Sequence, residues 1–206
     1  MHLDILTKQQ LEILDFIAVF KRSYYLVGGT AIALHIGHRC SIDFDLFTSK
    51  AINKSIIDNA ILKQKCKKQT IFISDEQMHF FLNDIKVTFF FYPFPIIHND
   101  MLKNIISLPS LLTLSAMKAY ALGRRAKWKD YVDLYFIIKN YYSINEINLE
   151  AKKIFNDLFS EKLFRSQLAF HDDIDYTEPV EYMNGFDVNE KEIKRFLIEK
   201  SLEAID

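Results

Sequence analysis

The sequence predicts a mixed α/β half, residues 1–108, followed by an all-helical half, residues 109–206. Short apolar or alternating runs, which are typical of strands, recur between residues 24 and 92. From Pro109 onward the apolar residues instead recur at helical spacing. The stretch 93–109 contains three prolines and is the one plausible seam, across which we expect the two halves to pack together.

The bulk composition restricts the class of protein. Half of the 206 residues are hydrophobic, so the chain can bury a substantial core, and its net charge of -1 indicates neither a nucleic-acid nor a membrane partner by itself. Cys40 and Cys66 lie far apart, which argues against a disulfide framework and a cysteine metal site. With no signal-peptide pattern and no long uninterrupted apolar span, we expect a cytoplasmic protein.

The first elements follow from local signals. Thr7 and Gln10 have the spacing of a capping box, and the apolar residues after them predict an amphipathic helix that ends near Arg22. Residues 24–27 are apolar and β-prone and stop at a Gly-Gly pair, which predicts a strand that runs into a tight turn. Residues 30–36 then predict a short helix.

The rest of the first half predicts a sheet. Residues 41–47 alternate apolar Ile42, Phe44 and Leu46 with polar residues, the period of a strand with two unlike faces. A helix is expected over residues 51–65, and strands over 69–74, 78–82 and 86–92. Phe94 and its flanking prolines are expected to end the sheet.

The second half predicts only helices. Helical spacing runs from Pro109 to about Tyr142, with a break near Gly123. Further helices are expected over residues 147–158 and 189–202, on either side of an acidic, turn-rich segment at 171–184.

Gly28, Gly29 and Thr30 are candidates for binding phosphate. Two glycines let the backbone bend sharply and approach a ligand, and the start of the following helix presents unpaired N–H groups. A plain architectural turn accounts for the same residues. Arg39 and Ser41, which lie between this turn and the carboxylates below, are candidate neighbours of a bound nucleotide; for Ser41 a plain polar strand residue is the simpler interpretation.

Asp43 and Asp45 are candidate metal ligands. Separated by one residue on a strand, they emerge on one face about 7 Å apart at the backbone and can converge on a hard cation such as Mg²⁺. Two solvated carboxylates on an exposed strand would look the same. The combination is more specific, because one short helix joins the glycine turn to this strand and so brings a phosphate site beside metal ligands.

Two stretches resemble the AbiEii/AbiGii toxin family of nucleotidyltransferases. The first is residues 25–48, YLVGGTAIALHIGHRCSIDFDLFT, and the second is residues 116–135, AMKAYALGRRAKWKDYVDLY. The resemblance covers most of the chain in the right order. It implies a nucleotidyltransferase fold with a mixed sheet that carries Gly28, Gly29, Asp43 and Asp45, followed by a C-terminal helical bundle.

The resemblance also implies a function. Lys118 would bind the nucleotide, and Asp130 would join Asp43 and Asp45 as a catalytic residue. The cofactor would be Mg²⁺ or Mn²⁺, the substrate a nucleoside triphosphate, and the acceptor a transfer RNA, another RNA or a protein. Such proteins are bacterial toxins, so a cognate antitoxin is a further expected partner. Read without the resemblance, Lys118 equally fits a lysine that pairs with Asp130 or reaches water.

One position departs from the pattern of the wider fold, which adds a third carboxylate from a neighbouring strand. Residues 85–93 offer Thr88 at that place. A third acid often activates the attacking hydroxyl, so Asp130 would have to replace it, or the chain binds nucleotide without transferring it. A non-enzymatic binding module of the same fold and a metal phosphodiesterase built on Asp43 and Asp45 are therefore the alternatives.

A second sequence signal concerns nucleic acid. Four cations surround the single tryptophan, Trp128: Arg124, Arg125, Lys127 and Lys129. A basic cluster with an aromatic residue can contact a nucleic-acid backbone and stack on a base. A solvated junction between helices is the simpler interpretation.

Overall fold

A computed structural model describes residues 1–64 and 66–203 of the chain. The chain divides into two units. The first unit comprises Met1–Gly37 and Ser41–Ser110, and the second comprises His38–Cys40 and Leu111–Asp206. Residues 38–40 thus group with the helices of the second unit, although in sequence they connect two elements of the first.

The first unit contains a seven-stranded mixed sheet. Its strands are β1 (Tyr25–Val27), β2 (Phe44–Thr48), β3 (Lys68–Ile73), β4 (Gln77–Leu82), β5 (Ile85–Phe91), β6 (Asp100–Leu102) and β7 (Ile106–Leu108). They lie in the order β3-β4-β5-β2-β1-β7-β6. The pairs β2–β5 and β1–β7 are parallel, and the other four pairs are antiparallel.

The predicted end of the sheet at Phe94 is wrong, because β6 and β7 continue it beyond β1. Each of these strands has only three residues, too few to show a period of two in the sequence. Their place in the sheet depends on pairing with β1, which lies far away in the chain, so local patterning does not reveal them.

The helices of the first unit are η1 (Leu3–Ile5), α1 (Lys8–Glu12), α2 (Leu14–Ala18), α3 (Gly28–Ile36) and α4 (Lys54–Gln64). The capping box of Thr7 and Gln10 is confirmed. The single helix expected to run to Arg22 is instead two short helices, which meet at Ile13. The expected end of the following helix at Lys65 lies outside the described residues.

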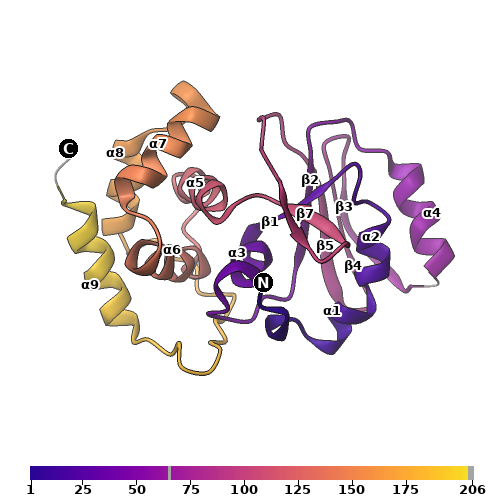
Figure 1. Ribbon diagram of the computed structural model, residues 1–206, viewed down its shortest axis with the longest axis horizontal. Coiled ribbons are helices and arrows are strands. Elements are labelled where there is room, and N and C mark those ends of the chain that lie inside the picture. The colour runs from indigo at the N-terminus through magenta and orange to yellow at the C-terminus, as the bar shows by residue number, and fades with distance from the viewer. Residues whose placement is uncertain (65, 204–206) are drawn as a thin grey trace. The chain divides into compact units, whose positions relative to one another are not determined.

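The core of this unit contains an aromatic cluster between the sheet and α2. Phe16 of α2 makes edge contacts with Phe80 of β4 and Phe89 of β5, and Phe20 also contacts Phe89. Burying a side chain of this size contributes roughly 1.5–3 kcal/mol. Helices α2 and α4 lie on this side of the sheet and α3 lies on the other (Figure 1). The sheet therefore has one face packed under α2 and α4, and an opposite face that carries the polar residues of β2 and β5.

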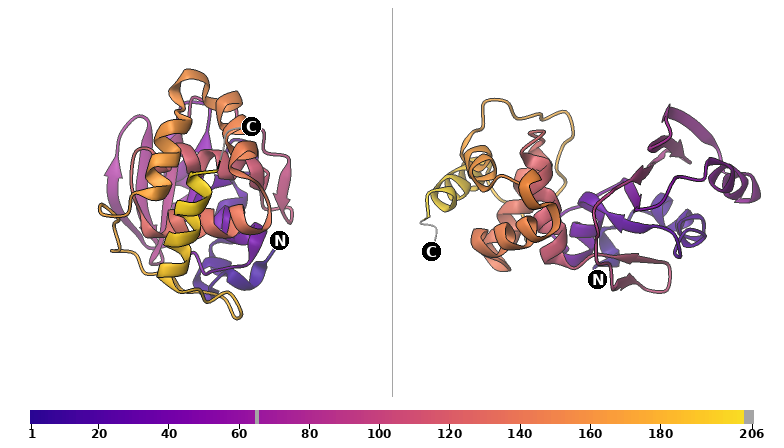
Figure 2. Two further views of the ribbon diagram at one scale, coloured as in Figure 1. Left: turned by 90° about the vertical axis from the view of Figure 1, so that its left-hand side faces the viewer. Right: turned by 90° about the horizontal axis from the view of Figure 1, so that it is seen from above.

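The second unit is a helical bundle, as predicted. It comprises α5 (Leu111–Leu122), α6 (Trp128–Asn140), α7 (Ile144–Phe155), η2 (Asn156–Leu158), α8 (Glu161–Ala169) and α9 (Glu190–Ser201). Helix α5 packs against α7, and α9, which is yellow in Figure 2, packs against both α6 and α8. Helix α8, which buries Phe164 and Leu168, was not predicted.

The acidic segment after α8 is connected to residues 38–40 by backbone hydrogen bonds. The Cys40 N–H donates to the Glu181 carbonyl at 2.8 Å, and the Met183 N–H donates to the His38 carbonyl at 3.0 Å. These bonds explain why residues 38–40 belong to the helical unit. Among the described residues, no helix is long and apolar enough to cross a membrane.

Candidate functional site

Gly28 is the first residue of α3, directly after β1, and must be glycine for two reasons. Its φ of +74° is a left-handed conformation that side chains rarely adopt. A Cβ at this position would also lie 2.3 Å from Oδ2 of Asp45, far inside contact distance. The absence of a side chain therefore lets the Asp45 carboxylate lie directly against the glycine turn.

Thr30, in the first turn of α3, holds the segment that leads to the carboxylates. Its buried hydroxyl donates to the carbonyl of Asp43 and lies 2.9 Å from the hydroxyl of Ser41. The Gln10 side chain donates to the Ser41 carbonyl at 2.8 Å. Thr30 and Ser41 are thus brought together and fix the backbone before β2. Their contact with a nucleotide stays a prediction.

Asp43 and Asp45 are both half-buried, and they differ in setting. Asp45 lies within β2, whereas Asp43 directly precedes the strand. Ile42 was expected to share a buried face with Phe44 and Leu46, and this is wrong, because its side chain is 52% exposed. Strand alternation therefore begins only at Phe44. The position of Asp43 is set instead by the hydrogen bond that its carbonyl accepts from Thr30.

A row of directly paired residues extends from Asp45 across the sheet. Asp45 of β2 pairs with Thr88 of β5, and Thr88 pairs with His79 of β4. Directly paired residues point to the same face, so these three side chains lie side by side. Thr88 Oγ1 lies 3.4 Å from His79 Nδ1, and His79 Nε2 lies 2.8 Å from Oε1 of Gln77. Burial and then Lys86 lower the pKa of His79, which favours a neutral imidazole.

The donor set at the glycine turn fits a hard divalent cation. Among residues 1–64 and 66–203, no group of three or more His, Cys, Asp or Glu side chains has metal-site geometry. Mg²⁺ is commonly held by one or two carboxylates, with its other positions filled by water and substrate phosphates. Asp43 and Asp45, beside a turn without side chains, meet that requirement when a phosphorylated substrate supplies the remaining ligands.

The helical unit contains a buried cluster of charges centred on Asp133. Arg39 bonds both of its carboxylate oxygens, with Nε at 2.7 Å and NH2 at 2.9 Å. Lys118 Nζ lies 2.9 Å from Asp133 Oδ2 and 2.6 Å from Asp130 Oδ1. His38 Nε2 lies 2.8 Å from Asp133 Oδ1. Two buried cations thus face two buried carboxylates, the half-exposed Arg125 also contacts Asp130, and His38 can donate a proton from Nε2 while neutral.

The ionisation states in this cluster follow from burial and pairing. Burial alone would raise the pKa of Asp133, but the adjacent Arg39 and Lys118 hold it well below its usual range. Burial alone would lower the pKa of Lys118, but Asp130 and Asp133 raise it. Both residues are therefore charged at neutral pH. Burial lowers the pKa of His38 despite its bond to Asp133, so this imidazole is neutral.

The structure brings the predicted residues Lys118 and Asp130 into direct contact and adds two residues that the sequence interpretation did not select, Asp133 and His38. The spacing of three between Asp130 and Asp133 on one helix face was the available signal. Arg39 is 1% exposed and engaged by Asp133, so its predicted contact with phosphate stays a prediction.

The basic cluster around Trp128 is engaged within the helical unit. Lys127 and Lys129 both pair with Glu178, and Arg125 Nε lies 3.3 Å from Asp130 Oδ2. Trp128 itself is buried. Its indole therefore has no exposed face on which a nucleic-acid base could stack, and the sequence signal for a nucleic-acid contact here is accounted for by internal packing.

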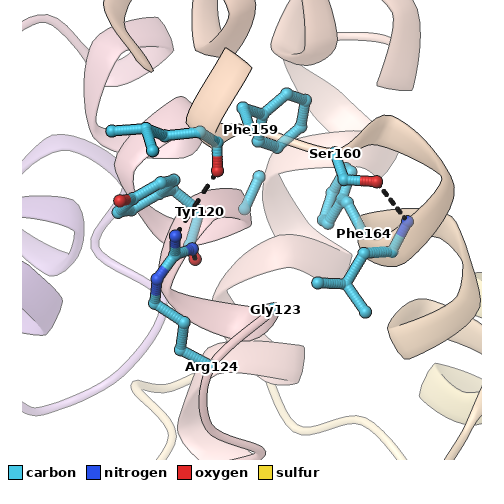
Figure 3. Close-up of a pocket in the computed structure, with 9 residues that line it drawn as sticks. Tyr120, Gly123, Arg124, Phe159, Ser160 and Phe164 are labelled. Atoms are coloured by element: carbon cyan, nitrogen blue, oxygen red, sulfur yellow. Dashed lines mark hydrogen bonds between the residues drawn. The ribbon is translucent and has the colours of Figure 1, made fainter. Parts of the chain in front are cut away.

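Arg124, the fourth cation, lines a cavity of about 220 Å³ (Figure 3). Its guanidinium lies 3.5 Å from the centre of the Tyr120 ring and donates to the carbonyl of Leu158 at 3.4 Å. On the other side of the cavity, the Ser160 hydroxyl accepts the Leu163 N–H at 3.2 Å and caps α8. The polar groups of Arg124 and Ser160 thus bond to residues that line the cavity.

Comparisons with known proteins identify the fold. No protein-family model matches the chain. It is 29% identical over 174 residues to an uncharacterized protein of Aquifex aeolicus, a match that covers 81% of this chain and 84% of that protein. The structure is similar to MenT4, a nucleotidyltransferase toxin of Mycobacterium tuberculosis, with a TM-score of 0.61 at 12% identity over 94% of this chain and 82% of MenT4.

A second solved structure, a candidate nucleotidyltransferase of Helicobacter pylori, matches with a TM-score of 0.59 at 14% identity, covering 94% of this chain and 91% of that one. The chain therefore has the nucleotidyltransferase fold with a C-terminal helical bundle, as predicted. The resemblance to nucleotidyltransferase toxins is confirmed at the level of the fold.

Proposed function

From the premise of a nucleotidyltransferase fold, we propose that this chain transfers a nucleotide from a nucleoside triphosphate to an acceptor, with Mg²⁺ or Mn²⁺ bound by Asp43 and Asp45. The observation that carries the proposal is the position of Asp45 against Gly28. It combines a metal ligand with a turn that a phosphate can approach, within one unit of the protein.

The residues of the turn have defined tasks in this proposal. Gly28 and Gly29 allow the phosphates to approach the backbone, and the N–H groups at the start of α3 bind them. Thr30 and Ser41 hold the segment of Asp43 in place through their hydroxyl contacts. When bound, the divalent ion would neutralise charge on the triphosphate and favour attack by the acceptor hydroxyl.

Lys118, Asp130 and Arg39 complete the proposal from the helical unit. We assign Lys118 to the triphosphate and Asp130 to the acceptor hydroxyl, as base or orienting residue, because of their resemblance to the family motif. Arg39 is assigned to the triphosphate because it lies between the glycine pair and the two aspartates in the sequence. Their buried pairs keep Lys118 protonated and Asp130 beside a cation in the absence of substrate. On binding, the triphosphate would replace these carboxylates as the charged partner of Lys118.

The biological setting we propose is that of a bacterial toxin in the cytoplasm, with an RNA acceptor such as transfer RNA and a cognate antitoxin. Its support is the fold shared with a toxin of that class. Expression of the wild-type chain should then slow growth, and Asp43→Ala should relieve the effect. Normal growth during wild-type expression would count against the toxin role.

The direct test is transfer of label from each labelled nucleoside triphosphate to total bacterial RNA or protein in the presence of Mg²⁺. We expect transfer by the wild type and its loss in Asp43→Ala/Asp45→Ala and in Lys118→Ala. Cleavage of RNA in place of labelling, dependent on the same two aspartates, would favour a metal phosphodiesterase instead.

A second candidate function is a nucleotide-binding module of the same fold that does not transfer. It is favoured by Thr88, which lies directly opposite Asp45 where a third carboxylate would complete the site. Metal-dependent nucleotide binding by the wild type, with no labelled product from any acceptor, would select this function.

A further inference from the structure

The row that begins at Asp45 continues to the edge of the sheet and ends in exposed aromatic side chains. His79 pairs with Thr88 on one side and with Phe72 of the edge strand β3 on the other. Phe81 lies two residues after His79, and Lys86 pairs with Phe81, so both share the same face. We call Phe72, His79, Phe81 and Lys86 the open strand face.

The open strand face differs in exposure from the opposite face of β4 and β5. Phe72 is 47% exposed and Phe81 is 36% exposed, although both are large apolar residues within a regular sheet. Phe80 and Phe89, on the opposite face of the neighbouring positions, are fully buried under the helices. Helices therefore cover one face of β4 and β5, whereas the rings of Phe72 and Phe81 on the other face are in contact with solvent.

We propose that the open strand face binds the bases of a single-stranded nucleic acid. The end of this nucleic acid reaches Asp45 and accepts the transferred nucleotide. The inference rests on the proposed function and makes the acceptor a nucleic acid, excluding a protein. Bases stack on exposed aromatic rings whatever their sequence, and a lysine beside them meets the phosphate backbone. Gln77, bonded to His79, adds an amide that can bind a base edge.

Continuity with the candidate site selects this occupant. Asp45 is paired with Thr88, Thr88 with His79, and His79 with Phe72. A nucleic-acid strand that lies on the rings of Phe72 and His79 therefore leads to the Asp45 carboxylate. His79 and Phe72 touch edge to face with ring centres 6.1 Å apart, which makes the path continuous. Because the pKa of His79 is lowered, its ring stacks as a neutral imidazole.

A protein strand that adds to the edge of β3 is the less suitable occupant. Such an addition needs a regular row of backbone donors and acceptors. The register of β3 shifts between Thr70 and Phe72, the mark of a β-bulge, which interrupts that row and blunts an edge. The edge of β3 is therefore adapted against strand addition, and the same register shift brings Phe72 opposite His79, onto the aromatic face.

The test compares matched substitutions on the two faces of β3. Phe72→Ala and Phe81→Ala remove the proposed stacking rings, whereas Ile73→Ala removes an equally exposed residue that pairs with buried Met78 on the opposite face. Fluorescence anisotropy of a labelled short single-stranded RNA of mixed sequence gives the affinity, and the same sequence as a duplex gives a second reading. Thermal unfolding checks that each variant is folded.

We expect Phe72→Ala and Phe81→Ala each to weaken binding of the single strand at least about fivefold, and Ile73→Ala to leave it unchanged. The duplex should bind more weakly, because its bases are already stacked. Lys86→Gln should reduce the slope of log affinity against log salt concentration by about 0.7, the value for one phosphate contact on a single strand.

Binding of Mg²⁺-nucleotide, measured on the same variants, separates this inference from the proposed function. If Phe72→Ala, Phe81→Ala and wild type bind RNA equally well and nucleotide binding is intact, RNA binding by the open strand face is overturned and the proposed function is not. Capture of a protein partner that these substitutions abolish, with no RNA binding, would also overturn it. Ring-dependent RNA binding without any nucleotide binding would uphold the face and overturn the proposed function.

Discussion

The Asp45 carboxylate occupies the space that a side chain at Gly28 would need, with Oδ2 only 2.3 Å from the position of a Cβ there. The turn and the metal ligand are therefore one structural unit, and neither can change without the other. The same carboxylate heads the row of paired residues through Thr88 and His79. Four substitutions test how far the site and the buried charges depend on such relationships.

Gly28→Ala should abolish metal-dependent nucleotide binding, because the new Cβ displaces the Asp45 carboxylate. Gly185→Ala is a matched control, since Gly185 also has a positive φ, +85°, but a Cβ there meets nothing within 4 Å. In both variants backbone strain should lower the free energy of unfolding by about 1 kcal/mol. In Gly28→Ala the clash with the Asp45 carboxylate should lower it further. Calorimetric nucleotide titration and urea unfolding measure both effects. Equal behaviour of the two variants would refute the close packing.

Thr88→Asp should create a third carboxylate beside Asp45 and tighten Mg²⁺ binding on the order of tenfold. Without metal, the added like charge should destabilise the fold, and Mg²⁺ should restore it. The melting temperature should therefore rise with Mg²⁺ more steeply in Thr88→Asp than in the wild type. Thr88→Val, of similar size and uncharged, should show no such gain, and a gain there would assign the effect to packing.

Asp133→Asn should destabilise the helical unit by roughly 3–5 kcal/mol, because it leaves Arg39 and Lys118 buried with a single carboxylate. In the wild type the pKa of Asp133 is held below its unfolded value, so its contribution is present above about pH 3.8 and is lost as the pH falls further. Urea unfolding at neutral pH measures the loss. Asp75→Asn, which breaks a surface pair with Lys54, should cause no measurable change.

His38 should make the free energy of unfolding depend on pH in the mildly acidic range. Burial lowers its folded pKa below the unfolded value of 6.5, so the unfolded chain takes up the proton first. The free energy of unfolding should therefore fall as the pH drops below about 6.5, until the folded pKa is reached. His38→Gln keeps an N–H donor for Asp133 and should flatten this slope. Unfolding curves between pH 5 and 7 with the same slope in both proteins would contradict the prediction.

The sequence by itself determined the local elements and the local part of the site. The capping box at Thr7, the strands that became β3 to β5, and the glycine pair at the start of α3 all depend on neighbours a few residues apart. Side-chain period and turn chemistry act at that range, so they can be read from the order of residues. The pair Asp43 and Asp45 is visible in the sequence, but strand alternation begins only at Phe44, so the side-chain period did not place Asp43.

Tertiary structure decided everything that depends on pairing between distant segments. Which residues face Asp45 follows from the parallel register of β2 and β5, and the row to Phe72 follows from two further pairings. The sequence selected Asp130, but Asp133 became the centre of the buried charges because Arg39, 94 residues away, bonds to it. The short strands β6 and β7 join the sheet because β7 pairs with the distant strand β1 and β6 pairs with β7. Long-range packing chooses among locally equivalent patterns, and no local pattern contains that choice.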